Sequence, residues 1–229
     1  MSATERTAAE AKAANIALMG ESLGAVYSEL WQEVVWIHSN WAHYVELFGT
    51  SPQRIELLNK AAPSFFRTVQ DTLFEAVLLH LARLTDSAKS VGKDNLSLQQ
   101  LVALAADGPI GEQLAAVTLR AIAASEFARD WRNRKLAHRD LNLALDQHVD
   151  PLASASRLAV KEALVAIIEV LNAVSSHYSD STTAFDLPGD SDSVSLLYVV
   201  RDGLRSKEQK LARLRSGDYT PDDFKHEAI

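Results

Sequence analysis

Residues 64–85 read SFFRTVQDTLFEAVLLHLARLT. Apolar side chains recur in this stretch three or four residues apart, at Phe66, Val69, Leu73, Val77, Leu81 and Leu84. That spacing places them on one face of an α-helix, which must be buried against other elements. The stretch therefore predicts a long amphipathic helix and not a strand, in which apolar residues would alternate.

The same spacing recurs along the rest of the 229-residue chain. No run of Val, Ile and Thr alternates over strand length, and 9 Gly and 6 Pro are too few for a protein of many tight turns. We therefore expect an all-α protein, an up-and-down helical bundle with additional N- and C-terminal helices. The expected helices cover residues 4–48, 52–61, 64–85, 96–106, 110–140, 153–178 and 193–216.

One polar segment suggests where the chain divides. Residues 180–193 read DSTTAFDLPGDSDS, an acidic stretch that also contains Gly, Pro and Ser. We expect residues 1–180 to form the helical bundle. Residues 181–229 are expected to form an acidic loop, a C-terminal helix and a tail that pack on the bundle or extend it. A second polar stretch, residues 86–95, is expected to be a loop.

The composition excludes several classes of protein. Hydrophobic residues make up 47% and charged residues 23%, so the chain has enough apolar surface to fold. There is no Cys, which excludes disulfides, thiolate nucleophiles and Cys-ligated zinc. The N-terminus does not resemble a secretory signal, and no stretch of about 18 apolar residues occurs. We expect a cytoplasmic protein with no membrane segment, metal or cofactor.

A basic island interrupts an otherwise acidic chain. Residues 120–139 carry six Arg or Lys and two acidic residues, a net charge of +4, whereas the whole chain carries −7. The densest polar cluster, RDWRNRKLAHRD, covers residues 129–140 at the end of an expected helix. Here Arg, Asn and His replace apolar side chains on the packed face, and such a break in pattern often marks function. Cations near a helix C-terminus also stabilise the helix dipole, which is the commoner explanation of such a cluster taken alone.

The other histidines give weaker signals. Two of them, His38 and His80, lie on or beside apolar stripes and are expected to be core or interface residues with satisfied hydrogen bonds. The rest are expected to be solvated: His43, His148, His177 and His226. The chain has no P-loop, no H-E-x-x-H and no G-x-S-x-G motif.

The segment Arg132-Asn133-x4-His138 resembles the R-x4–6-H motif of the HEPN superfamily, small helical proteins of which many are ribonucleases. The wider chain resembles the AbiU-type HEPN group linked to bacterial abortive infection. Three blocks carry this resemblance: LARLTD at residues 81–86, Asn95-Leu96-Ser97-Leu98-x2-Leu101, and RNRKLAHRD at residues 132–140. With the matching helix order they span about residues 20–180, and the resemblance implies a bundle of HEPN type.

The resemblance implies metal-independent cleavage of RNA by attack of its own 2′-OH on the adjacent phosphate. His138, whose unperturbed pKa would be about 6.5, can serve as general acid or base. Arg132 can oppose the charge that develops on the phosphate, and Asn133 can position the phosphate or a base. Arg129, Arg134, Lys135 and Arg139 are expected to contact the RNA backbone. The family form is a two-fold homodimer in which both motifs line one cleft, and an antitoxin protein is a further candidate partner.

Two points stay open at this stage. On an ideal helix Arg134 shares the face of His138, while Arg132 fits the family spacing, and Arg132 is our choice. Some HEPN toxins carry a Tyr two residues after the His, which an antitoxin modifies, but Asp140 occupies that position here.

The alternatives to a ribonuclease are a non-catalytic HEPN-like module that binds nucleic acid, nucleotide or a partner protein, and a helical dimer without ligand. All three share one fold, so only the site can separate them.

Overall fold

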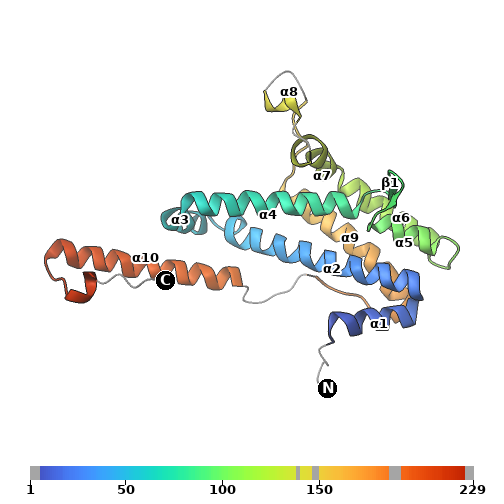
Figure 1. The fold of residues 1–229 in the computed structure, drawn as a ribbon, viewed down its shortest axis with the longest axis horizontal. Coiled ribbons are helices and arrows are strands. Elements are labelled where there is room, and N and C mark those ends of the chain that lie inside the picture. The colour runs from blue at the N-terminus through green and yellow to red at the C-terminus, as the bar shows by residue number, and fades with distance from the viewer. Residues whose placement is uncertain (1–5, 138–139, 146–149, 186–191, 225–229) are drawn as a thin grey trace. The chain divides into compact units, whose positions relative to one another are not determined.

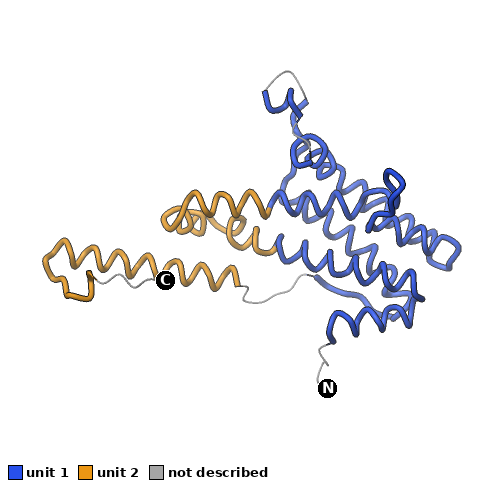
Figure 2. The backbone as a smooth tube through the Cα atoms, viewed as in Figure 1, with its two compact units in different colours: residues 1–41, 74–187 blue, residues 42–73, 188–229 orange. Residues whose placement is uncertain are grey.

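The computed structural model describes residues 6–137, 140–145, 150–185 and 192–224 (Figure 1). Within these ranges the regular secondary structure is helical apart from one short hairpin, which confirms the predicted all-α class. The chain forms two compact units, residues 1–41 with 74–187 and residues 42–73 with 188–229 (Figure 2). In the described part of the chain no helix combines the length and apolar character that a membrane span needs.

The first unit is a helical bundle with one continuous apolar core. Its helices are α1 (Ala8–Met19), α2 (Glu21–Tyr44, of which residues up to 41 belong here), the second half of α4 (Pro63–Leu84), α5 (Leu98–Ala105), α6 (Gly111–Ala124), α7 (Glu126–Trp131) and α9 (Arg157–Ser179). Side chains from α2, α4, α5, α6 and α9 are fully buried together, among them Leu30, Ile37, Leu78, Leu81, Leu101, Leu114 and Ile167. Each such side chain stabilises the fold by about 1.5–3 kcal/mol relative to exposure. The apolar stripe predicted over residues 64–85 contributes Val77, Leu81 and Leu84 to this core.

The predicted helix 4–48 is interrupted, and this expectation is wrong at Gly20. Gly20 has a φ of 86°, a conformation that glycine adopts without steric cost, and it ends α1. The chain then reverses, so that α1 packs against α2. A Cβ atom at Gly24 would lie 2.6 Å from the carbonyl oxygen of Asn15, so this close contact requires glycine. Thr7 and Glu10 form a capping box at the start of α1.

The predicted helix 110–140 is also divided. The buried Ser125, with φ −101° and ψ 6°, separates α6 from α7. After Trp131 the helix widens into the π-helix η2 (Arg132–Leu136), in which the Ala137 amide donates to the Arg132 carbonyl five residues earlier at 2.8 Å. Single turns of this kind occur frequently at functional sites. A four-residue helix, α8 (Leu141–Ala144), follows with Asp140 as its N-cap.

Two further expectations needed correction. The helix expected over residues 153–178 begins later than predicted, since α9 starts at Arg157 with Ser156 as its N-cap. The loop at 86–95 contains a hairpin, β1 (Lys89–Ser90) antiparallel to β2 (Lys93–Asp94), closed by Val91 and Gly92. Both turn residues have positive φ, 48° and 76°, as the turns of two-residue hairpins require.

The second unit has a small core of its own. It contains the end of α2, the π-helix η1 (Val45–Gly49), α3 (Pro52–Ala61), the first half of α4, α10 (Asp192–Ser216) and the 3₁₀ turn η3 (Pro221–Phe224). Leu47, Leu58, Phe66 and Leu197 are buried together. α3 begins at Pro52 and ends at Ala61, as predicted, and Ser51 is its N-cap. His43 is not solvated as expected: it is half-buried, and its Nδ1 lies 2.6 Å from the Ser193 hydroxyl.

Candidate functional site

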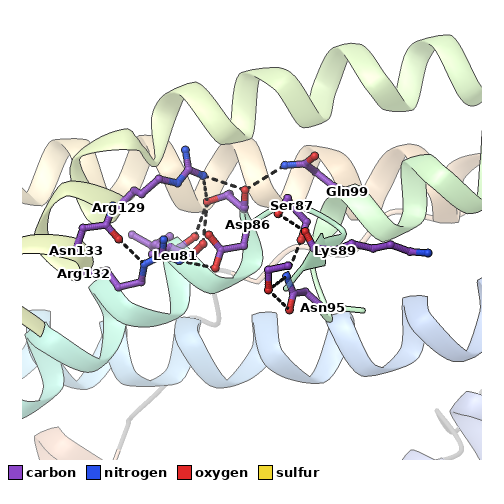
Figure 3. Close-up of polar contacts among 12 residues, drawn as sticks. Leu81, Asp86, Ser87, Lys89, Asn95, Gln99, Arg129, Arg132 and Asn133 are labelled. Carbon is purple, nitrogen blue, oxygen red and sulfur yellow. Dashed lines mark hydrogen bonds and ion pairs between the residues drawn. The ribbon is translucent and has the colours of Figure 1, made fainter. Parts of the chain in front are cut away.

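The three sequence blocks that lie far apart in the chain meet at the C-terminal end of α4. Figure 3 shows Asp86 from the first block, Asn95 from the second, and Arg132 and Asn133 from the third in one cluster. Asn95 Nδ2 donates to the Ser87 carbonyl at 2.9 Å and to the Ser90 hydroxyl at 3.1 Å, which secures the base of the hairpin beside Asp86. The Gln99 amide reaches the Thr85 carbonyl at 3.4 Å. Residues of the three blocks thus lie close together in the first unit.

Arg132 is the best-positioned of the predicted catalytic residues. Its Nη1 forms an ion pair with Asp86, and its Nε donates to Asn133 Oδ1 at 3.1 Å. The Arg132 side chain is 22% exposed and that of Asp86 is 28% exposed, so the pair is half-buried but open to solvent. Within residues 6–137, 140–145, 150–185 and 192–224, Nη2 of Arg132 makes no hydrogen bond. This N–H group faces no protein partner there and is able to donate a hydrogen bond to a ligand anion.

Arg129 has a structural role at the end of α4. Its Nη2 donates to the Thr85 carbonyl at 2.9 Å, and its Nη1 pairs with Glu126 at 2.8 Å. The last carbonyls of a helix have no partner within the helix, and an Arg side chain commonly satisfies them. Thr85 is fully buried. Arg129 therefore joins α7 to α4.

Arg134 and its neighbours hold the segment before α9. Arg134 donates to the carbonyls of Asp150 and Pro151, the latter at 3.3 Å, and pairs with Asp130. Asp130 in turn accepts from the Ala153 amide at 2.8 Å, and the indole N–H of Trp131 donates to the Ala153 carbonyl at 2.8 Å. These side chains hold residues 150–153, which form no regular secondary structure. The contacts are consistent with the late start of α9 at Arg157.

Lys135 is the most exposed of the described basic residues in the cluster. Its side chain is 43% exposed, its Nζ lies 3.2 Å from Glu75 on α4, and it lies over the Trp131 ring at 4.6 Å from the ring centre. Trp131 also contacts Phe74 edge-to-face. Lys135 can leave Glu75 and bind a phosphate at little cost in free energy, because exposed ion pairs contribute little to the stability of the fold.

Carboxylates from other parts of the fold balance most of the positive charge of the basic island (residues 120–139). Asp86, which follows α4, pairs with Arg132, and Glu75 from α4 pairs with Lys135. Glu169 from α9 pairs with Arg120 at 3.0 Å. When these three carboxylates are counted, the net charge of +4 over residues 120–139 falls to +1. A broad electropositive surface is therefore not what distinguishes this region.

Two predicted site residues, His138 and Arg139, lie outside the described residues. Arg134 was expected to share a helix face with His138, but that expectation assumed α-helical spacing, which η2 does not have. Asp86 and Glu75 were missed as site residues, although Asp86 is the last residue of the block LARLTD. The order of blocks was a signal that Asp86 belongs to the site.

His80 and His177 behave as the sequence predicts. His80 is half-buried on α4, and its Nδ1 lies 3.1 Å from Glu33 Oε2 on α2. Burial lowers the pKa of His80, an effect that Glu33 opposes. His177 is exposed near the end of α9. Neither belongs to the cluster around Arg132.

Comparison with known proteins identifies one family. The family model described as AbiU2, a HEPN model, matches residues 20–196, which include all three blocks. No curated protein and no solved structure matches the chain.

Proposed function

The chain belongs to the AbiU2 family of HEPN domains associated with abortive infection, and we propose that it is a metal-independent endoribonuclease of the toxin or phage-defence type. The observation that carries the proposal is the half-buried Arg132–Asp86 pair, six residues before His138 in the matched motif. A guanidinium held on one side by a carboxylate presents its remaining donors in a fixed direction. That arrangement suits the recognition of a phosphate oxygen.

In the proposed reaction His138 removes the proton from the RNA 2′-OH or donates one to the leaving 5′-oxygen. The 2′-oxygen attacks phosphorus and the bond to the 5′-oxygen breaks, which leaves a 2′,3′-cyclic phosphate and a 5′-hydroxyl. Arg132 opposes the negative charge that develops on the phosphate oxygens. Asn133, which is exposed, donates through its amide nitrogen to the phosphate or to a base. Lys135 and Arg139 contact the RNA backbone, and a two-fold homodimer brings two motifs to one cleft.

A second candidate function is a non-catalytic HEPN module that binds nucleic acid, nucleotide or a partner protein. It is favoured by the structural contacts of Arg129 and Arg134, which join α7 and η2 to α4 and to residues 150–153. In that case the polar side chains of residues 129–135 would mainly stabilise the fold and would not take part in catalysis. RNA cleavage separates the two functions.

The test is cleavage of single-stranded RNA in the presence of EDTA, with the ends of the products identified. His138→Ala is expected to lower the rate by about 10²–10⁴-fold, because the proton transfer is lost. His177→Ala is the matched control and should cleave like the wild type, since His177 is exposed and lies outside the cluster. Binding of RNA without cleavage by the wild type would favour the second function. Equal cleavage by His138→Ala and the wild type would refute the proposed chemistry.

A further inference from the structure

The C-terminal half of α10, in the second unit (Figure 2), is another basic segment of the chain. Residues 201–216 carry six Arg or Lys and two acidic residues, a net charge of +4. Two of these cations have acidic partners, Arg201 with Asp202 and Arg213 with Asp223. The other four form no ion pair within the part of the chain that the structure describes: Arg205, Lys207, Lys210 and Arg215.

This absence of partners distinguishes the segment from the basic island at residues 120–139. Each described cation of the island has a carboxylate within ion-pair distance. The unpaired cations of α10 are therefore the part of the described surface where positive charge is least compensated by the fold. Uncompensated charge of one sign attracts partners of the other sign.

An apolar stripe runs along the same helix and continues past the core of the second unit. Leu197 and Val200 pack into that core, where α10 contacts α3 and η1. The alternating spacing of three and four residues then continues along the helix, with Leu204, Leu211 and Leu214. Neither apolar core of the described residues includes these three leucines, and Leu211 is 42% exposed. We call these three residues the leucine stripe.

α10 is a preformed helix as far as its C-terminal end. The Asp218 amide donates to the Arg213 carbonyl at 3.1 Å, and the Thr220 amide donates to the Asp223 carboxylate at 3.0 Å. The same carboxylate pairs with the Arg213 guanidinium, which fastens η3 to the last turns of the helix. A helix that is already ordered loses little conformational entropy when a partner binds to it.

The positions of the charges indicate what kind of partner fits. In the heptad register of the stripe, Lys207 takes the one stripe position without a leucine, and Lys210 and Arg215 take flanking positions. Glu208 is the acidic residue at such a flanking position. Charged residues at flanking positions meet those of the facing helix and determine which helix can pair. Carboxylates on the facing helix would therefore complement α10.

Other occupants use only part of this surface. In a parallel pair of α10 helices, Lys210 would face Arg215 of the second copy, and like charges oppose that pairing. A nucleic acid would pair with the cations and leave the leucine stripe in water. An acidic amphipathic helix uses both features, because it covers the leucines and neutralises the cations.

We propose that residues 201–216 of α10 dock an acidic amphipathic helix of a partner protein. The apolar face of that helix covers the leucine stripe, and its carboxylates pair with Lys207, Lys210 and Arg215. The family model matches residues 20–196, so the docking segment lies beyond the matched part. The proposal does not rest on the proposed ribonuclease function.

The test uses the full chain and a fluorescently labelled synthetic peptide of about three heptads, with Leu at the a and d positions and Glu at the e and g positions. The wild type should bind this peptide, as measured by fluorescence anisotropy. Binding should weaken as the salt concentration rises from about 0.05 to 0.3 M, because salt screens the charge pairs. The same peptide with Lys in place of Glu should not bind. Failure of the Glu peptide to bind would overturn the proposal.

Substitutions in α10 locate the binding surface. Leu211→Asp should weaken binding of the Glu peptide about 10- to 100-fold, the effect of no longer burying one leucine. Val199→Asp is the matched control and should bind like the wild type, because Val199 is 70% exposed and lies off the stripe. Lys210→Glu should weaken binding of the Glu peptide. Equal affinity of Leu211→Asp and the wild type would contradict the proposed surface.

Three further measurements identify a different occupant of the stripe. Urea unfolding of Leu211→Asp should match the wild type, and a clear loss of stability would show that the chain itself covers this leucine. Light scattering should give Leu211→Asp the mass of the wild type, and half that mass would assign the stripe to a second copy. Tighter binding of single-stranded RNA or of phosphatidylserine vesicles than of the Glu peptide, lost in Leu211→Asp, would assign it to those ligands. Each of these results would overturn the proposal.

Discussion

At the scale of single residues, Asp86 decides how Arg132 is presented. The carboxylate occupies one side of the guanidinium, Asn133 occupies Nε, and Nη2 is left without a partner among the described residues. An unpaired Arg side chain would sample many rotamers, and the entropy lost on ordering it would reduce its contribution to a transition state. Asp86 is thus a positioning residue in the proposed reaction.

Asp86→Asn tests this role. The amide keeps the shape of the side chain but removes its charge, so Arg132 is held less firmly, and we expect RNA cleavage to fall by about 10- to 100-fold. Asp94→Asn, on the exposed hairpin, is the control and should have no such effect. Urea unfolding of Asp86→Asn checks that the fold is retained. A cleavage rate unchanged in Asp86→Asn would show that the pair does not position Arg132.

His80 predicts a pH dependence of stability. Burial lowers its pKa in the folded state, whereas the unfolded chain binds the proton at pH about 6.5. The unfolded state therefore binds more protons below this pH. Stability from His80 is complete above pH about 6.5 and is lost as the pH falls through the lower pKa of the folded state. Urea unfolding between pH 5 and 8 should show a smaller acid-side loss in His80→Gln than in the wild type, while His177→Gln should follow the wild type.

The identity of the site residues could be predicted only in part. Arg132 and Asn133 were chosen because they fit the spacing of the R-x4–6-H motif, and Lys135 because it lies in the basic cluster around that motif; their roles in the reaction stay predictions. The structural roles of Arg129 and Arg134 were not predicted, because their partners at Thr85 and at residues 150–151 are 16 or more residues away. Pairing over such separations depends on how helices pack, which periodicity does not specify.

At the scale of elements, the helices were predicted well and their interruptions were not. α3, α4 and α10 begin and end within one or two residues of the expected bounds, because Pro, Ser and Gly mark their ends. Ser125 lies within continuous apolar spacing, so the pattern indicates no break there. Gly20 is a residue type that commonly ends helices, and this signal was overlooked. The hairpin at 89–94 was missed because Val91 occupies a turn position that normally favours Asn or Gly.

Val91 also provides a prediction for this element. A β-branched residue at φ 48° is strained, and its side chain is fully exposed and gains no burial in return. Val91→Asn should therefore raise the free energy of unfolding by about 1 kcal/mol, measured by urea denaturation. Val91→Thr, which is also β-branched, should give no comparable gain. A loss of stability in Val91→Asn would show that the valine makes a stabilising contact.

At the scale of the whole molecule, the chain is divided in a way that its sequence does not show. The boundaries at 41/42 and 73/74 fall inside α2 and α4, where no polar linker occurs, and the third boundary at 187/188 lies near the acidic stretch that was expected to divide the chain. Each unit has its own apolar core. A split of this kind depends on which helix faces meet, and a linker-based prediction cannot detect it.

The proposed homodimer gives a prediction for the assembled protein. Light scattering coupled to gel filtration should give a mass of about twice 25.1 kDa. If both motifs contribute to one cleft, mixing an excess of His138→Ala with wild type should lower the cleavage per wild-type chain. Mixing with His177→Ala should leave it unchanged. A monomeric mass for active protein would contradict the shared cleft.

The wider turn of η2 bears on how this chain can vary in length. A helix whose amides reach back five residues accommodates one more residue than an α-helical turn between the same two ends. Deleting a residue there would restore the ordinary helical turn. The segment between Arg132 and Leu136 is therefore a place where the loss of one residue can be absorbed by a change of helical winding.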